Sequence, residues 1–144
     1  MRGYPKWFYR FLIFSFTLLT LTGFLLIPNA LDMRLDWDVS WHLPGAMRLA
    51  VVALHATIAF LVVSQLGALW SVHMRIGWRH HKNLPTGLGL VAVLLGLVLT
   101  GLGIYYAGED WSVPASASHI IIGIFIPFVL VWHIMAARHK QKLR

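Results

Sequence analysis

Four apolar stretches, at residues 11–27, 48–73, 86–106 and 115–136, constrain the fold of this 144-residue chain more than any other feature. An α-helix needs about 20 apolar residues to cross the roughly 30 Å of hydrocarbon in a bilayer. The chain is 58% hydrophobic and only 12% charged, unlike a soluble domain. We therefore predict an all-α fold, a membrane-spanning four-helix bundle that contacts membrane lipid and forms a single domain over residues 1–144.

The net charge of +7 is distributed by side of the membrane rather than gathered into a nucleic-acid-binding surface. Most basic residues lie before the first stretch, between the second and third, or after the fourth: Arg2, Lys6, Arg10, Arg75, Arg79, Lys82, Arg138, Lys140, Lys142 and Arg144. The other two connections hold all the acidic residues: Asp32, Asp36, Asp38, Glu109 and Asp110. The positive-inside rule then predicts that both termini are cytoplasmic, and we expect no nucleic acid partner.

The chain has no cysteine. This composition excludes disulfides, iron–sulfur clusters and covalently attached c-type haem, so any cofactor must be held by other side chains.

Four histidines lie within or at the ends of the apolar stretches, where polar side chains are costly and usually functional. They are His55, His73, His119 and His133. His133 is fourteen positions after His119, which on an α-helix is a turn of about 1400°, close to a whole number of turns, and a rise of ~21 Å. His73 is eighteen positions after His55, which is about five turns and a rise of ~27 Å. Each pair therefore shares one helix face.

The second and fourth helices run in the same direction, so their histidines form an outer pair, His55 with His119, and an inner pair, His73 with His133. Two facing neutral imidazoles suit six-coordinate iron, which predicts two haem b groups. The second ring nitrogen of each ligand needs a carbonyl or hydroxyl partner. Candidate hydroxyls are those of Thr57, Ser71 and Ser116. Because the two rises differ by ~6 Å, the inner pair requires a curved second helix or a displaced haem.

Glycines in the third helix repeat the fourteen-residue spacing of the histidines, at positions 87 and 101 and at positions 89 and 103. A porphyrin needs neighbours without side chains, so we predict that Gly89 and Gly103 line the cofactor. Packing between helices through small residues is the alternative explanation. Arg48 near the outer pair and Arg75 near the inner pair are candidate partners for haem propionates, although snorkelling and topology also account for arginine at these positions.

The spacing His119-x13-His133, with His55 near the outer end of the second helix, resembles the di-haem cytochrome b membrane subunits. This group includes bacterial cytochrome b561 and the gamma subunits of formate dehydrogenases and hydrogenases. Those proteins typically take an inner ligand from the start of the first helix, where this chain has Trp7-Phe8-Tyr9-Arg10. His73 would have to replace that ligand, and otherwise the chain holds one haem.

The resemblance implies electron transfer between a quinone pool and a periplasmic redox protein, such as a cytochrome c or a dehydrogenase subunit, in the bacterial inner membrane. It makes a subunit of an oxidoreductase complex the expected role. Two alternatives stay open: a stand-alone quinone reductase that oxidises superoxide or another small donor at the outer surface, and a pigment-binding or structural membrane subunit.

Overall fold

A computed structural model describes residues 4–80 and 83–142 of the chain, with side chains described up to residue 139. Of the residues in the predicted charge pattern, Arg2, Lys82 and Arg144 lie outside this part, as do the side chains of Lys140 and Lys142. All regular secondary structure in the described residues is helical: α1 (Lys6–Leu35), α2 (Gly45–Leu69), the π-helix η1 (Trp70–Met74), α3 (Arg75–Arg79), α4 (Leu84–Tyr106) and α5 (Glu109–Lys142).

In the described residues, four helices are long and apolar enough to cross a membrane. They are Lys6–Leu35, Gly45–Arg79, Leu84–Tyr106 and Glu109–His139, so α2, η1 and α3 together make one of them. The predicted all-α, four-span character is confirmed, and the chain is a multi-pass membrane protein. The orientation of its termini stays a prediction.

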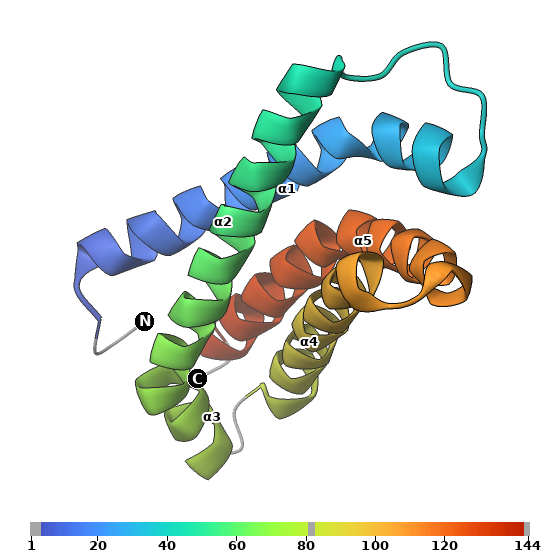
Figure 1. Cartoon of the computed structure of the whole chain (residues 1–144). Helices are drawn as coiled ribbons and strands as arrows, with labels where there is room; N and C mark the ends of the chain where they lie inside the picture. Colours follow the sequence, from blue (N-terminus) through green and yellow to red (C-terminus); the bar gives the residue numbers. More distant parts are fainter. Residues whose placement is uncertain (1–3, 81–82, 143–144) are drawn as a thin grey trace. The chain divides into compact units, whose positions relative to one another are not determined.

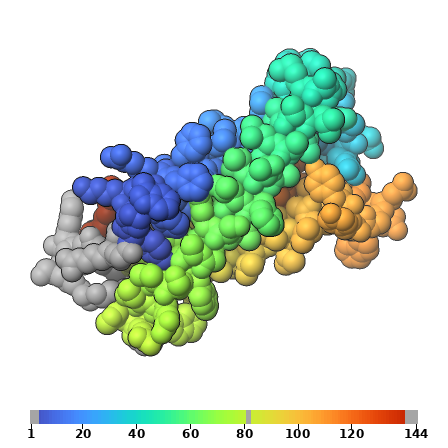
Figure 2. Space-filling view, turned by 60° about the vertical axis from the view of Figure 1, so that its left-hand side comes forward, coloured from blue at the N-terminus to red at the C-terminus, as the bar shows by residue number. Residues whose placement is uncertain are grey.

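The chain divides into two compact units, Met1–His80 and His81–Arg144. In the first unit α1 packs against α2, and in the second α4 packs against α5, so that each unit contains a helical hairpin (Figure 1). The contact between α1 (blue) and α2 (green) can also be followed in the space-filling view of Figure 2. The single-domain organisation expected from the sequence stays a prediction.

Helix ends explain why α1 is longer than the apolar stretch that predicted it. Asp36 follows the helix in the left-handed region, at φ 52°, which aspartate tolerates better than most residues. The amides of Asp36 and Trp37 both donate to the carbonyl of Leu31, which closes the last turn. Charged residues before this end, such as Arg34, are therefore part of the helix even though they do not contribute to its apolar core.

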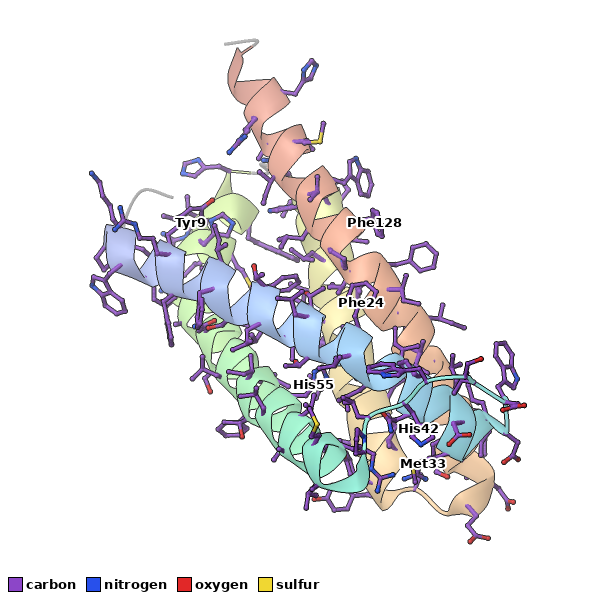
Figure 3. All side chains as sticks on the ribbon, turned by 90° about the horizontal axis from the view of Figure 1, so that it is seen from above. Tyr9, Phe24, Met33, His42, His55 and Phe128 are labelled. Carbon is purple, nitrogen blue, oxygen red and sulfur yellow. The ribbon has the colours of Figure 1, made fainter. Side chains whose placement is uncertain are left out.

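The surface of the helices is inverted relative to that of a soluble protein. Large apolar side chains are exposed, among them Phe60 at 76% and Phe128 at 66%, and Figure 3 shows Phe128 pointing away from α5. Polar side chains such as Ser15, Gln65 and Ser116 are buried. This distribution suits a hydrocarbon solvent, because lipid covers apolar side chains while polar groups must find partners inside the protein.

Asn29 fixes the connection between α1 and α2. Its side-chain Nδ2 donates to the carbonyl of Leu43 and its Oδ1 accepts from the Leu43 amide, each at 3.0 Å. Both residues are buried. One side chain therefore satisfies both backbone groups of a residue that lies just before α2, and holds the start of that helix against α1.

Replacing Asn29 with alanine leaves both backbone groups of Leu43 buried without these hydrogen bonds. We expect Asn29→Ala to lower the free energy of unfolding by about 1–3 kcal/mol, and to speed proteolysis within residues 36–44. Thr57→Ala is the control, because Thr57 is exposed and its hydroxyl donates only within its own helix, to the Ala53 carbonyl. Equal unfolding free energies for the two variants in detergent would contradict the role given to Asn29.

Candidate functional site: histidine, threonine and glycine in each hairpin

The two histidines of α5 each contact a threonine and a glycine of α4. Thr100 Oγ1 lies 3.0 Å from Nδ1 of His119, and Thr86 Oγ1 lies 3.0 Å from Nδ1 of His133. His119 also hydrogen-bonds to the backbone of Leu97. The spacing that predicted a shared face for the two histidines is thus matched by two threonines at the same spacing on the facing helix.

His55 has the same arrangement in the other hairpin. Its Nδ1 lies 2.9 Å from Thr22 Oγ1, and Figure 3 shows the ring in the region between α2 and α1. Thr22 is buried, with 5% of its surface exposed. Three of the four candidate ligands therefore have a threonine of the neighbouring helix at the same ring nitrogen.

A glycine follows each of these threonines and lies under the same ring. A methyl group at Gly23 would lie 3.2 Å from Cε1 of His55, one at Gly101 would lie 3.4 Å from Cε1 of His119, and one at Gly87 would lie 3.7 Å from Cε1 of His133. Cε1 is bonded to Nδ1, so the threonine contacts one atom of the imidazole edge and the following glycine faces the adjoining atom. We call these two residues a Thr–Gly pair.

The hydroxyl protons determine which histidine tautomer fits the hydrogen bonds. Thr22 Oγ1 lies 2.9 Å from the Leu18 carbonyl, and Thr100 Oγ1 lies 2.7 Å from the Gly96 carbonyl. A carbonyl can only accept, so the single hydroxyl proton is donated there, and the hydroxyl oxygen accepts from the ring. This assignment from the hydrogen-bond network puts the histidine proton on Nδ1.

Thr86 completes the pattern, since its hydroxyl donates to the Asn83 carbonyl at 3.1 Å and accepts from His133. In all three histidines Nε2 is then the basic nitrogen, the atom with which a neutral imidazole binds a metal. The chemistry of these side chains fits axial ligation of haem iron.

The threonines were missed by sequence reasoning, which looked for hydroxyls on the helices that carry the histidines. Ser116, Thr57 and Ser71 instead donate to carbonyls of their own helices. The available signal was the repeat Thr-Gly-Leu-Gly-Leu at 86–90 and Thr-Gly-Leu-Gly-Ile at 100–104. Three of the histidines have a hydroxyl at Nδ1, but it is not one of the hydroxyls predicted, and the expectation that this is the second nitrogen of a metal ligand stays a prediction.

His73 lies in a different backbone environment. It belongs to η1, where the π-helical turn is wider than an α-helical turn, and it is half-buried. The five whole turns counted between His55 and His73 assume a regular α-helix, and η1 interrupts that helix at Trp70. The shared face predicted for these two histidines therefore does not follow from the spacing alone, and the ligand role of His73 stays a prediction.

The two glycines singled out from the sequence are not those beneath the rings. A Cβ at Gly103 would lie 3.0 Å from the Cβ of Ala115, so this glycine allows α4 and α5 to approach closely. At Gly89 a Cβ would meet no heavy atom of the described residues within 4 Å. Helix packing accounts for Gly103, and the prediction that either glycine lines a cofactor is untested.

The two candidate arginines lie at helix ends. Arg48, in the first turn of α2, contacts the Met33 thioether of α1 through its guanidinium group. Arg75 opens α3, and its backbone amide donates to carbonyls of η1 while its side chain is exposed. Neither position tests the proposed pairing with a propionate.

No protein-family model matches this chain significantly, and neither does any curated protein or solved structure. The candidate ligands of this protein are therefore argued from its own residues.

Replacing the glycine of each Thr–Gly pair with alanine should destabilise the protein more, the closer the new Cβ lies to the histidine ring. Ordinary carbon contacts are about 3.5–4.0 Å, so Gly23→Ala must displace the His55 ring, whereas Gly87→Ala meets a ring at an ordinary distance. We expect Gly23→Ala to lower the free energy of unfolding by about 1–3 kcal/mol, Gly101→Ala to lower it less, and Gly87→Ala to change it least.

Gly67→Ala is the matched control for this series. Gly67 is exposed in the last turn of α2, inside the span Gly45–Arg79, and a Cβ there meets no heavy atom of the described residues within 4 Å. Alanine at such a position should stabilise the helix by about 0.5–1 kcal/mol. The free energies of unfolding are measured by titration in detergent. A Gly23→Ala variant as stable as Gly67→Ala would contradict the close packing of the His55 ring.

Proposed function

We propose that this protein transfers electrons across the bacterial inner membrane through b-type haems, between a quinone pool and a periplasmic redox partner. In this proposal His55 and His119 ligate the iron of an outer haem, and His73 and His133 ligate that of an inner haem. The chain acts as the cytochrome b subunit of a membrane oxidoreductase complex rather than as a complete enzyme.

The observation that carries the proposal is the state of three histidines in apolar helices. His55, His119 and His133 each have Nδ1 held by a threonine, which leaves Nε2 as the basic nitrogen. Satisfying a polar ring in hydrocarbon would need only some partner at each histidine. The repeated use of Nδ1 supports a metal ligand more specifically, because a metal-binding histidine usually has its second nitrogen hydrogen-bonded to fix the ring.

Ligation by two histidines also limits the chemistry. Such iron has no open coordination position, so a bound haem supplies reversible one-electron transfer rather than catalysis at the metal. The protein residues hold the ligands in orientation and exclude water with apolar helices. Arg48 and Arg75 are candidate partners for the propionates, because arginine forms charge-assisted hydrogen bonds with carboxylates.

The partners follow from the resemblance to di-haem cytochrome b subunits and from the charges of the predicted outer connections. Asp36 and Asp38, between α1 and α2, are exposed and acidic. Acidic surfaces of this kind complement basic partners such as a cytochrome c and raise their association rate. Quinone as the second partner rests on the resemblance.

Visible spectroscopy of purified protein with leucine substitutions tests the ligand assignment. We expect the unmodified protein to show a reduced b-type α-band. His119→Leu should remove the outer haem and His133→Leu the inner haem, each leaving the other, because leucine cannot ligate iron. Pyridine haemochrome quantitation then gives haem per chain, and a single haem unaffected by His73→Leu would exclude His73 as a ligand.

His139→Leu is the control for these variants, because His139 lies on the same helix, is exposed, and neighbours basic residues rather than the apolar core. It should keep the full haem content. Retention of all haem in both His119→Leu and His133→Leu would exclude the assignment. Long-wavelength chlorin bands in the unmodified protein would instead indicate a pigment-binding subunit.

A further inference from the structure

We infer that Thr22, Thr86 and Thr100 are positioning residues that set the reduction potentials of the haems through the histidine ligands. This inference rests on the proposed function and extends it to residues that do not touch the cofactor. Thr22 and Thr100 act on the outer haem through His55 and His119, and Thr86 acts on the inner haem through His133.

The geometry gives each threonine hydroxyl two roles that a methyl group cannot perform. It donates to a carbonyl of its own helix, and it accepts the Nδ1 proton of the histidine at 2.9–3.0 Å. The glycine that follows lets the ring edge lie against the helix, so the hydrogen bond and the ring position are set by adjacent residues. The three hydrogen bonds therefore restrict rotation of each ring about its Cβ–Cγ bond.

The electronic consequence follows from the direction of the hydrogen bond. A hydroxyl that accepts the Nδ1 proton draws that proton from the ring and leaves more electron density on Nε2, which makes the histidine a more basic ligand. A more basic ligand stabilises ferric over ferrous iron and lowers the reduction potential. In a helix surrounded by hydrocarbon this hydrogen bond is electrostatically stronger than it would be in water.

Paired substitutions separate this role from packing. In the haem-loaded protein, Thr100→Val keeps the shape of the side chain but removes the hydroxyl, and Thr100→Ser restores the hydroxyl without the methyl group. Thr86→Val with Thr86→Ser, and Thr22→Val with Thr22→Ser, form the corresponding pairs. Each set is studied by redox titration of the α-band and by electron paramagnetic resonance of the ferric low-spin haems.

Thr20→Val is the matched control. Thr20 lies two residues from Thr22 on α1, about 200° around the helix, and its hydroxyl donates to the Phe16 carbonyl. Thr20 is half-buried, and its replacement also removes a helix hydroxyl, so any general effect of losing such a group on the potentials appears in this variant as well.

We expect each valine variant to raise the midpoint potential of one haem component and to shift its low-spin g-values, and each serine variant to restore both. Thr22→Val and Thr100→Val should shift the same component, that of the outer haem. Thr86→Val should shift the other component, that of the inner haem. A valine variant can also lose its haem. In that case, a serine variant that keeps the haem at a near-native potential would still show that the hydroxyl acts through the histidine.

Two results would overturn the inference. Native potentials and g-values in all three valine variants would mean that the hydroxyls do not act through the ligands. Shifts of equal size in Thr20→Val would mean that they act only through general packing. An unmodified protein without haem would instead contradict the proposed function itself, and this inference with it.

Discussion

The structure depends on the requirement that polar groups surrounded by hydrocarbon find partners within the protein. Hydroxyl groups on these helices meet this requirement with the least rearrangement, by donating to a carbonyl one turn earlier. Ser15, Thr20 and Ser64 do so with the Phe11, Phe16 and Phe60 carbonyls. A hydroxyl used in this way has given away its only proton but keeps lone pairs. It can therefore accept a further hydrogen bond, and an imidazole from a neighbouring helix supplies the donor at three positions.

The same threonine–histidine hydrogen bond occurs in both hairpins, although the connections between their helices differ. In the first unit the connection between the helices of Thr22 and His55 is hydrogen-bonded to Asn29. In the second, only Ala107 and Gly108 connect the helices of Thr100 and His119. Equivalent ring contacts with such different connections indicate that helix packing, rather than loop geometry, determines the site. The close approach of Gly103 to Ala115 shows how this packing is achieved in the second unit.

The sequence predicted the helices well because length and apolarity determine membrane spans directly. The stretch at 86–106 differs little from α4, and the larger differences elsewhere come from helix ends such as Asp36, whose left-handed conformation is not visible in hydropathy. Helix periodicity predicted that His119 and His133 share a face, but it could not identify Thr86 and Thr100, because a contact between helices depends on their relative rotation. Nor does an apolar pattern distinguish α-helical from π-helical turns, which is why the environment of His73 was not predicted.

The order of the two residues in the Thr–Gly pair follows from the shape of imidazole. Successive residues on an α-helix are about 100° apart, so one residue can bond Nδ1 while the next lies beneath the adjoining carbon. At that second position a Cβ would lie near Cε1, from 3.2 Å at Gly23 to an ordinary contact of 3.7 Å at Gly87. Glycine thus allows the ring to lie close to the neighbouring helix, and threonine determines which ring nitrogen carries the proton. Since Cε1 separates Nδ1 from Nε2, holding the edge between them also fixes the direction in which the basic nitrogen points. Under the proposed function each histidine needs both its proton and its orientation fixed, and the threonine and glycine beside it can supply both.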